Sequence, residues 1–186
     1  MPKKSYVGQL IAANPLNPKD NLNHSVILIV THTPELALGL QLNRPLLDLD
    51  LAEVSDQVGI FVDSQDPVYY GGKMSPNKIH VIHSNDWSGL TTVQITDQLS
   101  VTNDISVLAA LSQGEGPEFY KACAGFWGWE SGQLDAQITA KPTSNVKHRW
   151  ETAPASLENV FDSGAELDHW HRVIEAAARE QVSNWF

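Results

Sequence analysis

The stretch that decides the fold of this chain is a run of ten residues in its second half. It reads Gly125-Phe126-Trp127-Gly128-Trp129-Glu130-Ser131-Gly132-Gln133-Leu134. An apolar run, residues 119–124, comes directly before it. Glycine is used where backbone comes close to a neighbour or takes a positive φ, and tryptophan brings a large contact area with one N–H donor. The pattern predicts a buried strand followed by a tight corner, whose aromatic rings either fill a core or form the floor of a pocket.

The rest of the chain predicts strands that follow one another with helices inserted between them. Strands are expected at residues 9–13, 25–31, 37–42, 67–70, 79–83, 91–95, 99–102 and 147–151. Helices are expected at residues 50–58, 104–111 and 132–139, the last two with Asn103 and Ser131 as caps, and at the C-terminal end, where Leu167, Trp170, Val173 and Ala177 share a face. Such an order favours an α+β domain with a largely antiparallel or mixed sheet, since regular strand–helix alternation is absent.

Composition favours one folded domain that does not contact nucleic acid directly. The 186 residues can bury a proper core, and no repeat or long linker divides residues 1–186. The net charge is −10 and the 12 Lys and Arg residues are scattered, whereas a DNA-binding surface needs clustered cations. Direct nucleic-acid binding is therefore disfavoured, although a local patch around Lys147 and Arg149 stays open.

The single cysteine and the short apolar runs bear on location and cofactors. Cys123 alone excludes an intramolecular disulfide and every multi-cysteine metal site. The apolar patch at residues 10–13 is too short for a signal peptide, and no stretch approaches transmembrane length. We expect a cytoplasmic protein without membrane contact, and no sequence feature indicates a cofactor.

Several blocks of the sequence resemble the YqgE/AlgH family. The blocks keep the family's order over roughly residues 6–162, and they are Gly8-Gln9-Leu10-Ile11-Ala12, Ser25-Val26, Asn43-Arg44-Pro45, Tyr70-Gly71-Gly72, His83-Ser84, Gly125-Phe126-Trp127-Gly128-Trp129 and Gly132-Gln133-Leu134. The resemblance implies an α+β fold whose sheet curls into a barrel-like core with flanking helices. It implies no catalytic residues, because the family consists of uncharacterised bacterial proteins; its AlgH branch carries the label of a transcriptional regulator.

Among the departures from the family pattern, two lie inside or directly after these blocks. Lys73 follows the glycine pair where proline is usual, and Trp127 fills a position that is usually small. A bulky ring at Trp127 would partly fill any pocket at the predicted corner.

Three turns carry the most constrained residue types, and together they form the candidate ligand or partner surface. Its members are Asn43, Arg44, Gly71, Gly72, Lys73, His83, Trp127, Trp129 and Gln133. The glycine pair with Lys73 forms either an anion-binding nest of N–H groups or a plain turn. Arg44 either clamps an anionic group or pairs with a nearby acid such as Asp48.

Catalytic and metal-binding patterns are incomplete. Ser131 lies one residue out of step with a Gly-x-Ser-x-Gly elbow, so it fits a helix cap better. His80 and His83 point to opposite faces of a strand, which argues against a shared metal. His83 and Ser84 stay as a base and nucleophile pair to be tested.

The sequence therefore leads to a non-catalytic protein that binds an unknown protein partner or a small molecule. A transcriptional regulator that acts indirectly through a protein partner is one alternative. An unrecognised enzyme is the other.

Overall fold

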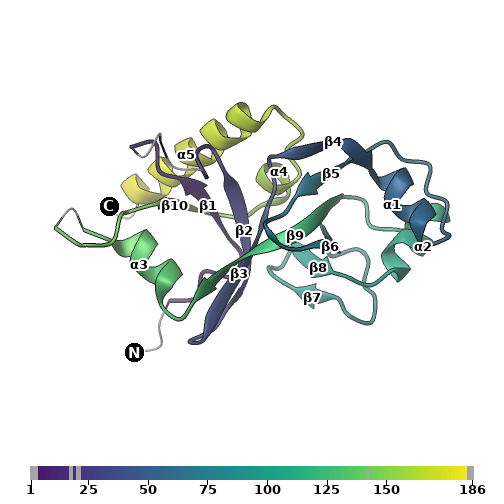
Figure 1. Cartoon of the computed structure of the whole chain (residues 1–186), viewed down its shortest axis with the longest axis horizontal. Coiled ribbons are helices and arrows are strands. Elements are labelled where there is room, and N and C mark those ends of the chain that lie inside the picture. The colour runs from purple at the N-terminus through teal and green to yellow at the C-terminus, as the bar shows by residue number, and fades with distance from the viewer. Residues whose placement is uncertain (1–3, 17–18, 20–21, 142, 184–186) are drawn as a thin grey trace.

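One long strand, β9 (Tyr120–Glu130), joins the two halves of the molecule. The computed structural model describes the chain except residues 1–3, 17–18, 20–21, 142 and 184–186. β9 pairs with β6 (Met74–Ser84) and β5 (Pro67–Tyr70) through its first part, and with β3 (Leu36–Gln41) through its last part. Figure 1 shows it running diagonally across the centre of the molecule. The two halves therefore share one continuous stretch of backbone.

The first half is an antiparallel sheet in the order β10–β1–β2–β3–β9. Its further strands are β1 (Gln9–Ala13), β2 (Val26–His32) and β10 (Trp150–Pro154). Helix α3 (Gln133–Thr139) packs against β9 and β10, and the long helix α5 (Glu166–Ser183) packs against β10, β1 and β2 (Figure 1). The short connection between residues 25–31 and 37–42 predicts an antiparallel hairpin, and the pairing of β2 with β3 confirms it.

The second half adds β6 and β5 to opposite edges of β9, because both strands pair with Cys123 and Ala124. β6 pairs with β8 (Leu99–Thr102), and β8 pairs with β7 (Val93–Gln94). β5 runs parallel to β9 and antiparallel to β4 (Pro45–Asp50). The helices of the remaining sequence are α1 (Leu51–Gln57), α2 (Ser106–Ser112) and α4 (Leu157–Val160). The whole is a mixed sheet curled into a half-barrel, which confirms the expected α+β class in a single domain.

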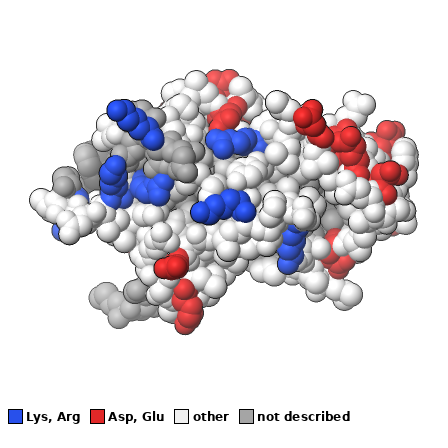
Figure 2. All heavy atoms as spheres, in the orientation of Figure 1, with Lys and Arg blue, Asp and Glu red and all other residues white. Residues whose placement is uncertain are grey.

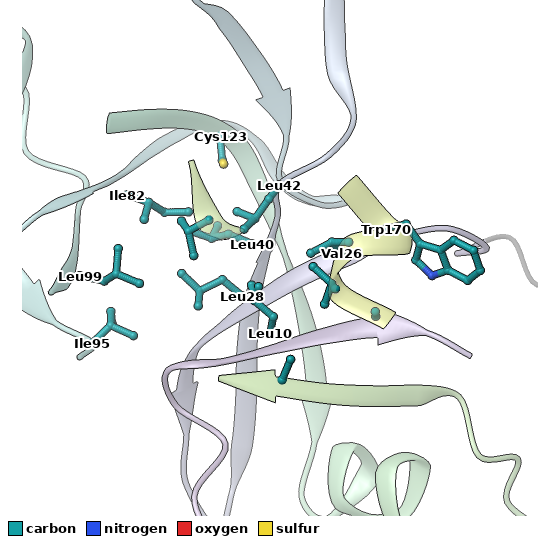
Figure 3. Close-up of a cluster of buried hydrophobic side chains, with 14 of the residues drawn as sticks. Leu10, Val26, Leu28, Leu40, Leu42, Ile82, Ile95, Leu99, Cys123 and Trp170 are labelled. Carbon is teal, nitrogen blue, oxygen red and sulfur yellow. The ribbon is translucent and has the colours of Figure 1, made fainter. Parts of the chain in front are cut away.

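Hydrophobic residues fill both faces of this curled sheet. The inner face holds one cluster from both halves, closed by Trp170 and Val173 of α5. Figure 3 shows Leu10, Val26, Leu28, Leu40, Leu42, Ile82, Ile95 and Leu99 gathered there. The outer face holds a second cluster under α3 and a third under α1 and α2. Successive β2 residues alternate between the first two clusters, so β2 is buried on both faces, as its continuous β-branched run predicts.

Two glycines, Gly72 and Gly125, explain how β9 changes partner in mid-strand. Gly125 has φ +74°, and a Cβ on it would lie 2.3 Å from the carbonyl oxygen of Gly72. A Cβ on Gly72 would lie 2.1 Å from the backbone carbon of Phe126. Two backbones meet here without side chains between them. The corner predicted within residues 125–134 lies at Ser131 and Gly132: the strand continues through Glu130, and the chain turns at Gly132, with φ +70°.

Two predicted helix starts were wrong. Helix α2 begins at Ser106, whose N–H donates to the Asp104 carboxylate, and Asn103 is not its cap. Helix α3 begins at Gln133 after Gly132, while the Ser131 hydroxyl donates to the carbonyl of Pro34. Short polar side chains compete for nearby backbone groups, so spacing alone does not decide which one caps a helix.

The C-terminal helix buries a slightly different stripe from the predicted one. Trp170, Val173 and Ala177 are buried as expected, but Leu167 is 45% exposed and His169 is buried instead. Strand β4 was not predicted, and the last strand begins at Trp150 instead of residue 147. Among the helices that the structure describes, none is long and apolar enough to cross a membrane.

Candidate functional site

Asn43 is a buried side chain that holds neighbouring segments together by hydrogen bonds, and it is not part of a binding surface. Its Oδ1 accepts the N–H of Val26 at 3.0 Å. Its Nδ2 donates to the carbonyls of His24 at 2.7 Å and Glu166 at 3.0 Å. Those bonds tie the end of β3 to the start of β2 and to the start of α5. With 2% of its surface exposed, Asn43 has no room for a ligand.

Arg44 joins the same junction from outside. Its guanidinium lies 3.1 Å from the Glu166 carboxylate, and both side chains are a little over a third exposed. The partner is therefore Glu166 of α5 and not Asp48. This surface pair holds the arginine against the helix.

Four of the sequence-predicted residues meet on the outer face of the sheet, where the two halves join. The Trp127 indole donates to Oε1 of Gln41 at 3.2 Å, and Lys73 Nζ lies 5.8 Å from the Trp127 ring. The N–H of Gly71 donates to the carbonyl of Ala124, which leaves an anion nest at the glycine pair, Gly71 and Gly72, one donor short. These residues lie where the backbones at Gly72 and Gly125 cross, and Trp127 is half-buried there.

Trp129 and Gln133 lie further along the outer face, in the cluster under α3. The Trp129 indole donates to Oε1 of Gln137 at 3.2 Å, and the same oxygen accepts the indole N–H of Trp150 at 2.8 Å. Gln133 accepts the backbone N–H of Glu130 and so shapes the turn into α3. Of the two roles open to the aromatic rings, Trp129 fills a core.

His83 and Ser84 do not form a base and nucleophile pair. His83 is fully buried, and its Nδ1 lies 2.8 Å from the Ser84 carbonyl, while burial lowers its pKa. The Ser84 hydroxyl donates instead to the carboxylate of Asp86 at 2.5 Å. Within the described ranges, no three His, Cys, Asp or Glu residues lie together as a metal site would require.

A cavity of about 370 Å³ lies beside β5 and the first part of β9, and we call it the Lys121 cavity. Its lining comes from four separate parts of the chain: Leu51, Asp66, Pro67, Tyr69, Glu118, Phe119, Tyr120, Lys121, Ala122, Phe161 and Ser163. Cavities of this size that combine apolar walls with a few polar groups are the usual binding sites of small molecules.

Lys121 is the unusual member of this lining. It is 5% exposed, and its Nζ donates to the carbonyls of Leu42 at 3.2 Å and Asp162 at 2.9 Å. The Tyr69 ring lies 4.3 Å from the same nitrogen. Burial lowers the pKa of Lys121 to about 8, partly opposed by Cys123 and Asp162. A lysine ammonium has three N–H donors, so two serve the backbone and one faces away from these carbonyls.

Aromatic rings and carboxylates complete the cavity. Phe119 and Phe161 stack with their centroids 5.7 Å apart. The Tyr120 hydroxyl donates to the Asp66 carboxylate at 2.7 Å. Burial raises the pKa of Tyr120, and the neighbouring Asp66 carboxylate raises it further. Glu118 is exposed beside them. The cavity therefore has apolar walls, one buried cation and an acidic rim.

Sequence reasoning missed this site, although one signal was present. Lys121 stands inside the apolar run 119–124, where a buried strand is expected. Lysine is almost never fully buried unless it is paired, so a lysine in such a run indicates a specific internal partner or site. Tyr69 and Phe161 gave no such signal, since only the fold brings them to Lys121.

Comparison with known proteins assigns the chain to a family. The model of the AlgH-like family matches residues 10–181. The chain belongs to the AlgH-like family. This membership confirms the resemblance found in the sequence blocks, and it extends through most of α5.

Individual relatives match this chain over most of its length. A UPF0301 protein of Sphingopyxis alaskensis is 32% identical over 160 residues, which cover 85% of this chain and 82% of that protein. A UPF0301 protein of Alcanivorax borkumensis is 33% identical over 175 residues, covering 92% and 87%. The solution structure of the AlgH protein from Pseudomonas aeruginosa has a TM-score of 0.73 at 29% identity, covering 96% and 92%. These names state no activity, so the geometry has to carry the functional argument.

Proposed function

We propose that this AlgH-like protein is a non-catalytic binding protein whose small-molecule ligand occupies the Lys121 cavity. One observation carries the proposal: a nearly buried lysine lies in the lining of a cavity with aromatic walls. Burying a cation is costly unless polar groups compensate it, so a lysine at this position points to a specific role. Perturbed pKa values in a cleft are typical of functional sites.

The lining favours a particular kind of ligand. The stacked rings of Phe119 and Phe161 suit a flat or apolar body, since aromatic faces pack best against such groups. The remaining donor of Lys121 suits a carbonyl or carboxylate oxygen. The carboxylates of Asp66 and Glu118 favour a donor or a positive charge at the outer end. A compact molecule with an apolar middle and polar ends of opposite kind meets all three conditions.

The contacts of Lys121 argue for binding over covalent catalysis. An amine that forms an imine with a carbonyl compound keeps at most one N–H. Two backbone carbonyls, those of Leu42 and Asp162, now accept from Lys121. An imine would leave at least one of them unpaired and buried, which costs about 1–3 kcal/mol. As an ammonium, Lys121 can serve both carbonyls and a ligand together.

Native mass spectrometry of the protein purified from its own cells tests this proposal. Ser163 is exposed on the lining, so Ser163→Trp should obstruct the cavity without touching the core. Ser112→Trp, at an exposed position on α2, is the matched control. We expect a discrete extra mass in the wild type and in the control, and its loss in Ser163→Trp.

A second measurement covers a ligand that is lost during purification. Benzoate and benzamide at millimolar concentration serve as probes with a flat body and an acceptor oxygen. We expect them to shift the amide resonances of Tyr120, Lys121 and Ala122, and to do so less in Ser163→Trp. Bare protein in the first experiment and no such shift in the second would together refute the proposal.

The same protein preparations also test the other two functions that the sequence left open. A hydrolase and transferase screen addresses the enzyme, and activity lost in His83→Ala or Ser84→Ala would revive that pair. Saturable, sequence-selective binding in a gel-shift titration at low salt would favour a regulator that contacts DNA itself. A cytoplasmic location belongs with the proposal, supported by the single cysteine, because disulfides are characteristic of exported domains.

A further inference from the structure

A second hollow of about 250 Å³ lies on the outer face of the sheet between α1 and α2, and we call it the α1/α2 groove. Val54 of α1, Ile79 and Val81 of β6 and Leu108 of α2 give it an apolar lining. The volume suits one large apolar side chain better than a whole small molecule with polar ends. It shares no lining residue with the Lys121 cavity.

Apolar side chains at the edge of this groove face solvent. Val58, directly after α1, is 48% exposed, and Ile105, at the start of α2, is 49% exposed. Single exposed apolar residues are ordinary, but a contiguous apolar patch around a hollow is typical of a protein-binding surface. The groove therefore offers both a socket and an apolar rim.

The end of the molecule that carries the groove is strongly acidic. Residues 45–72 contain six Asp and Glu residues and no Lys or Arg, and residues 101–119 contain three and none. Figure 2 shows red atoms gathered over the end that carries α1 and α2, while most of the blue atoms lie over the rest of the visible face. Lys78 lines the groove beside Asp104 as a local exception. This field attracts a basic partner and repels an anionic membrane surface.

We propose that the α1/α2 groove binds a segment of a partner protein in which a bulky apolar side chain is flanked by Lys or Arg. The apolar side chain would fill the socket, and the flanking cations would meet the surrounding carboxylates. Buried apolar anchors supply most of the affinity of such contacts, while complementary charge speeds association and selects the partner. Charge complementarity decides between this occupant and an uncharged or acidic one.

Two synthetic peptides of equal charge test the proposal by calorimetry or fluorescence anisotropy. Both peptides carry two basic residues, Lys or Arg, on each side of a central pair. The central pair is Leu-Phe in one peptide and Ala-Ala in the other. Each buried Leu or Phe side chain contributes about 1.5–3 kcal/mol, so the Ala-Ala peptide should bind at least about tenfold more weakly. Added salt should weaken both peptides, because it screens the acidic end.

Rim variants place the binding in the groove. Val58→Ser and Ile105→Ser change exposed positions, so the fold should persist, and Val182→Ser changes a residue of similar exposure on α5. We expect the first two to lose the preference for Leu-Phe and Val182→Ser to keep it. Equal affinity for the two peptides, an unchanged preference in both rim variants, or self-association in sedimentation that competes with the peptide would overturn the proposal. Ser163→Trp should bind the Leu-Phe peptide like the wild type, so this test is separate from the Lys121 cavity.

Discussion

Asn43 and Arg44 are neighbours in the sequence but differ in the solvent exposure of their side chains. Asn43 is buried and makes three hydrogen bonds to backbone groups of β2 and the α5 start. Arg44 makes a partly exposed ion pair with Glu166. Both residues bind Glu166 at the start of α5. Substitutions at the two positions therefore compare the stability contributed by buried hydrogen bonds with that contributed by a surface salt bridge.

We predict that Asn43→Ala lowers the free energy of unfolding by about 2–4 kcal/mol, because it leaves buried backbone donors and acceptors unpaired. Arg44→Ala should lower it by less than about 1 kcal/mol, since water screens the pair with Glu166. Urea unfolding of the two variants measures the difference. A larger effect at Arg44 than at Asn43 would contradict this assignment.

Lys121 makes stability depend on pH in the alkaline range. Burial lowers its pKa in the folded protein to about 8, from an ordinary value of 10.5. Between these values the unfolded chain holds a proton that the native state has lost. The contribution of Lys121 to the free energy of unfolding therefore rises with pH across this window, by at most about 3 kcal/mol. The buried Cys123 thiol acts in the opposite direction above about pH 9, because burial raises its pKa to about 12 and the unfolded chain then loses its proton first. Below about pH 8 both states are protonated and the slope vanishes.

Lys121→Met should remove this slope, since methionine keeps the apolar length without the charge. Lys78→Met, at an exposed lysine, should keep it. Urea unfolding from about pH 8 to about pH 10 measures the slope as the difference between wild type and Lys121→Met, because Cys123 titrates in both proteins. Above about pH 10, Tyr69 and Tyr120 also contribute, because burial raises the pKa of each. Parallel curves for wild type and Lys121→Met would show that Lys121 titrates normally.

At the scale of elements, β9 depends on a backbone crossing that only glycine allows. Gly125 and Gly132 have nearly the same φ, +74° and +70°. A Cβ at Gly125 would meet the Gly72 carbonyl oxygen at 2.3 Å, whereas a Cβ at Gly132 would meet nothing within 4 Å. The two positions therefore separate the effect of the dihedral angle from the effect of crowding.

We predict that Gly132→Ala costs about 1–2 kcal/mol of stability, from the left-handed conformation alone. Gly125→Ala should cost that amount plus about 1–3 kcal/mol, because the clash with Gly72 forces the two strands apart. Chemical denaturation of both variants gives the comparison. Equal losses would mean that the crossing at Gly125 is not crowded.

At the scale of the whole molecule, the two halves share β9 and the inner hydrophobic cluster. Leu10 and Val26 of the first half pack in one cluster with Ile82 and Leu99 of the second (Figure 3). Unfolding one half would expose part of that cluster on the other. The halves should therefore unfold together, although the outer clusters under α3 and under α1 and α2 are separate.

We predict a single cooperative transition in urea. Fluorine-labelled tryptophan provides a reporter in each half: Trp150 lies under α3, and Trp87 packs against the cluster under α1 and α2. The NMR signals of the native state at both positions should disappear with the same urea midpoint. Distinct midpoints would show that β9 does not couple the halves.

Local patterns were enough to predict much of the fold. The β-branched run in β2, the hairpin to β3 and the stripe of Trp170, Val173 and Ala177 follow from short-range periodicity, which a chain carries wherever it folds. The glycines of the opening stretch also indicated a close approach, although not the element that approaches. The barrel-like curl was expected from the family resemblance, and the sheet of the structure and its likeness to the AlgH protein from Pseudomonas aeruginosa confirm it.

The tertiary structure alone decided what those residues do. The predicted surface split into a buried, hydrogen-bonded position at Asn43, a core position at Trp129 and a packed crossing at Trp127 and Gly71. Neighbours took up their polar groups, and apart from Gln137 beside Trp129 these neighbours lie far away in the sequence. The Lys121 cavity is the converse case. Tyr69, Lys121 and Phe161 are separated by tens of residues, so no sequence window contains them together. Burial and pairing are properties of three-dimensional surroundings, which is why spacing predicted the strands but not the site.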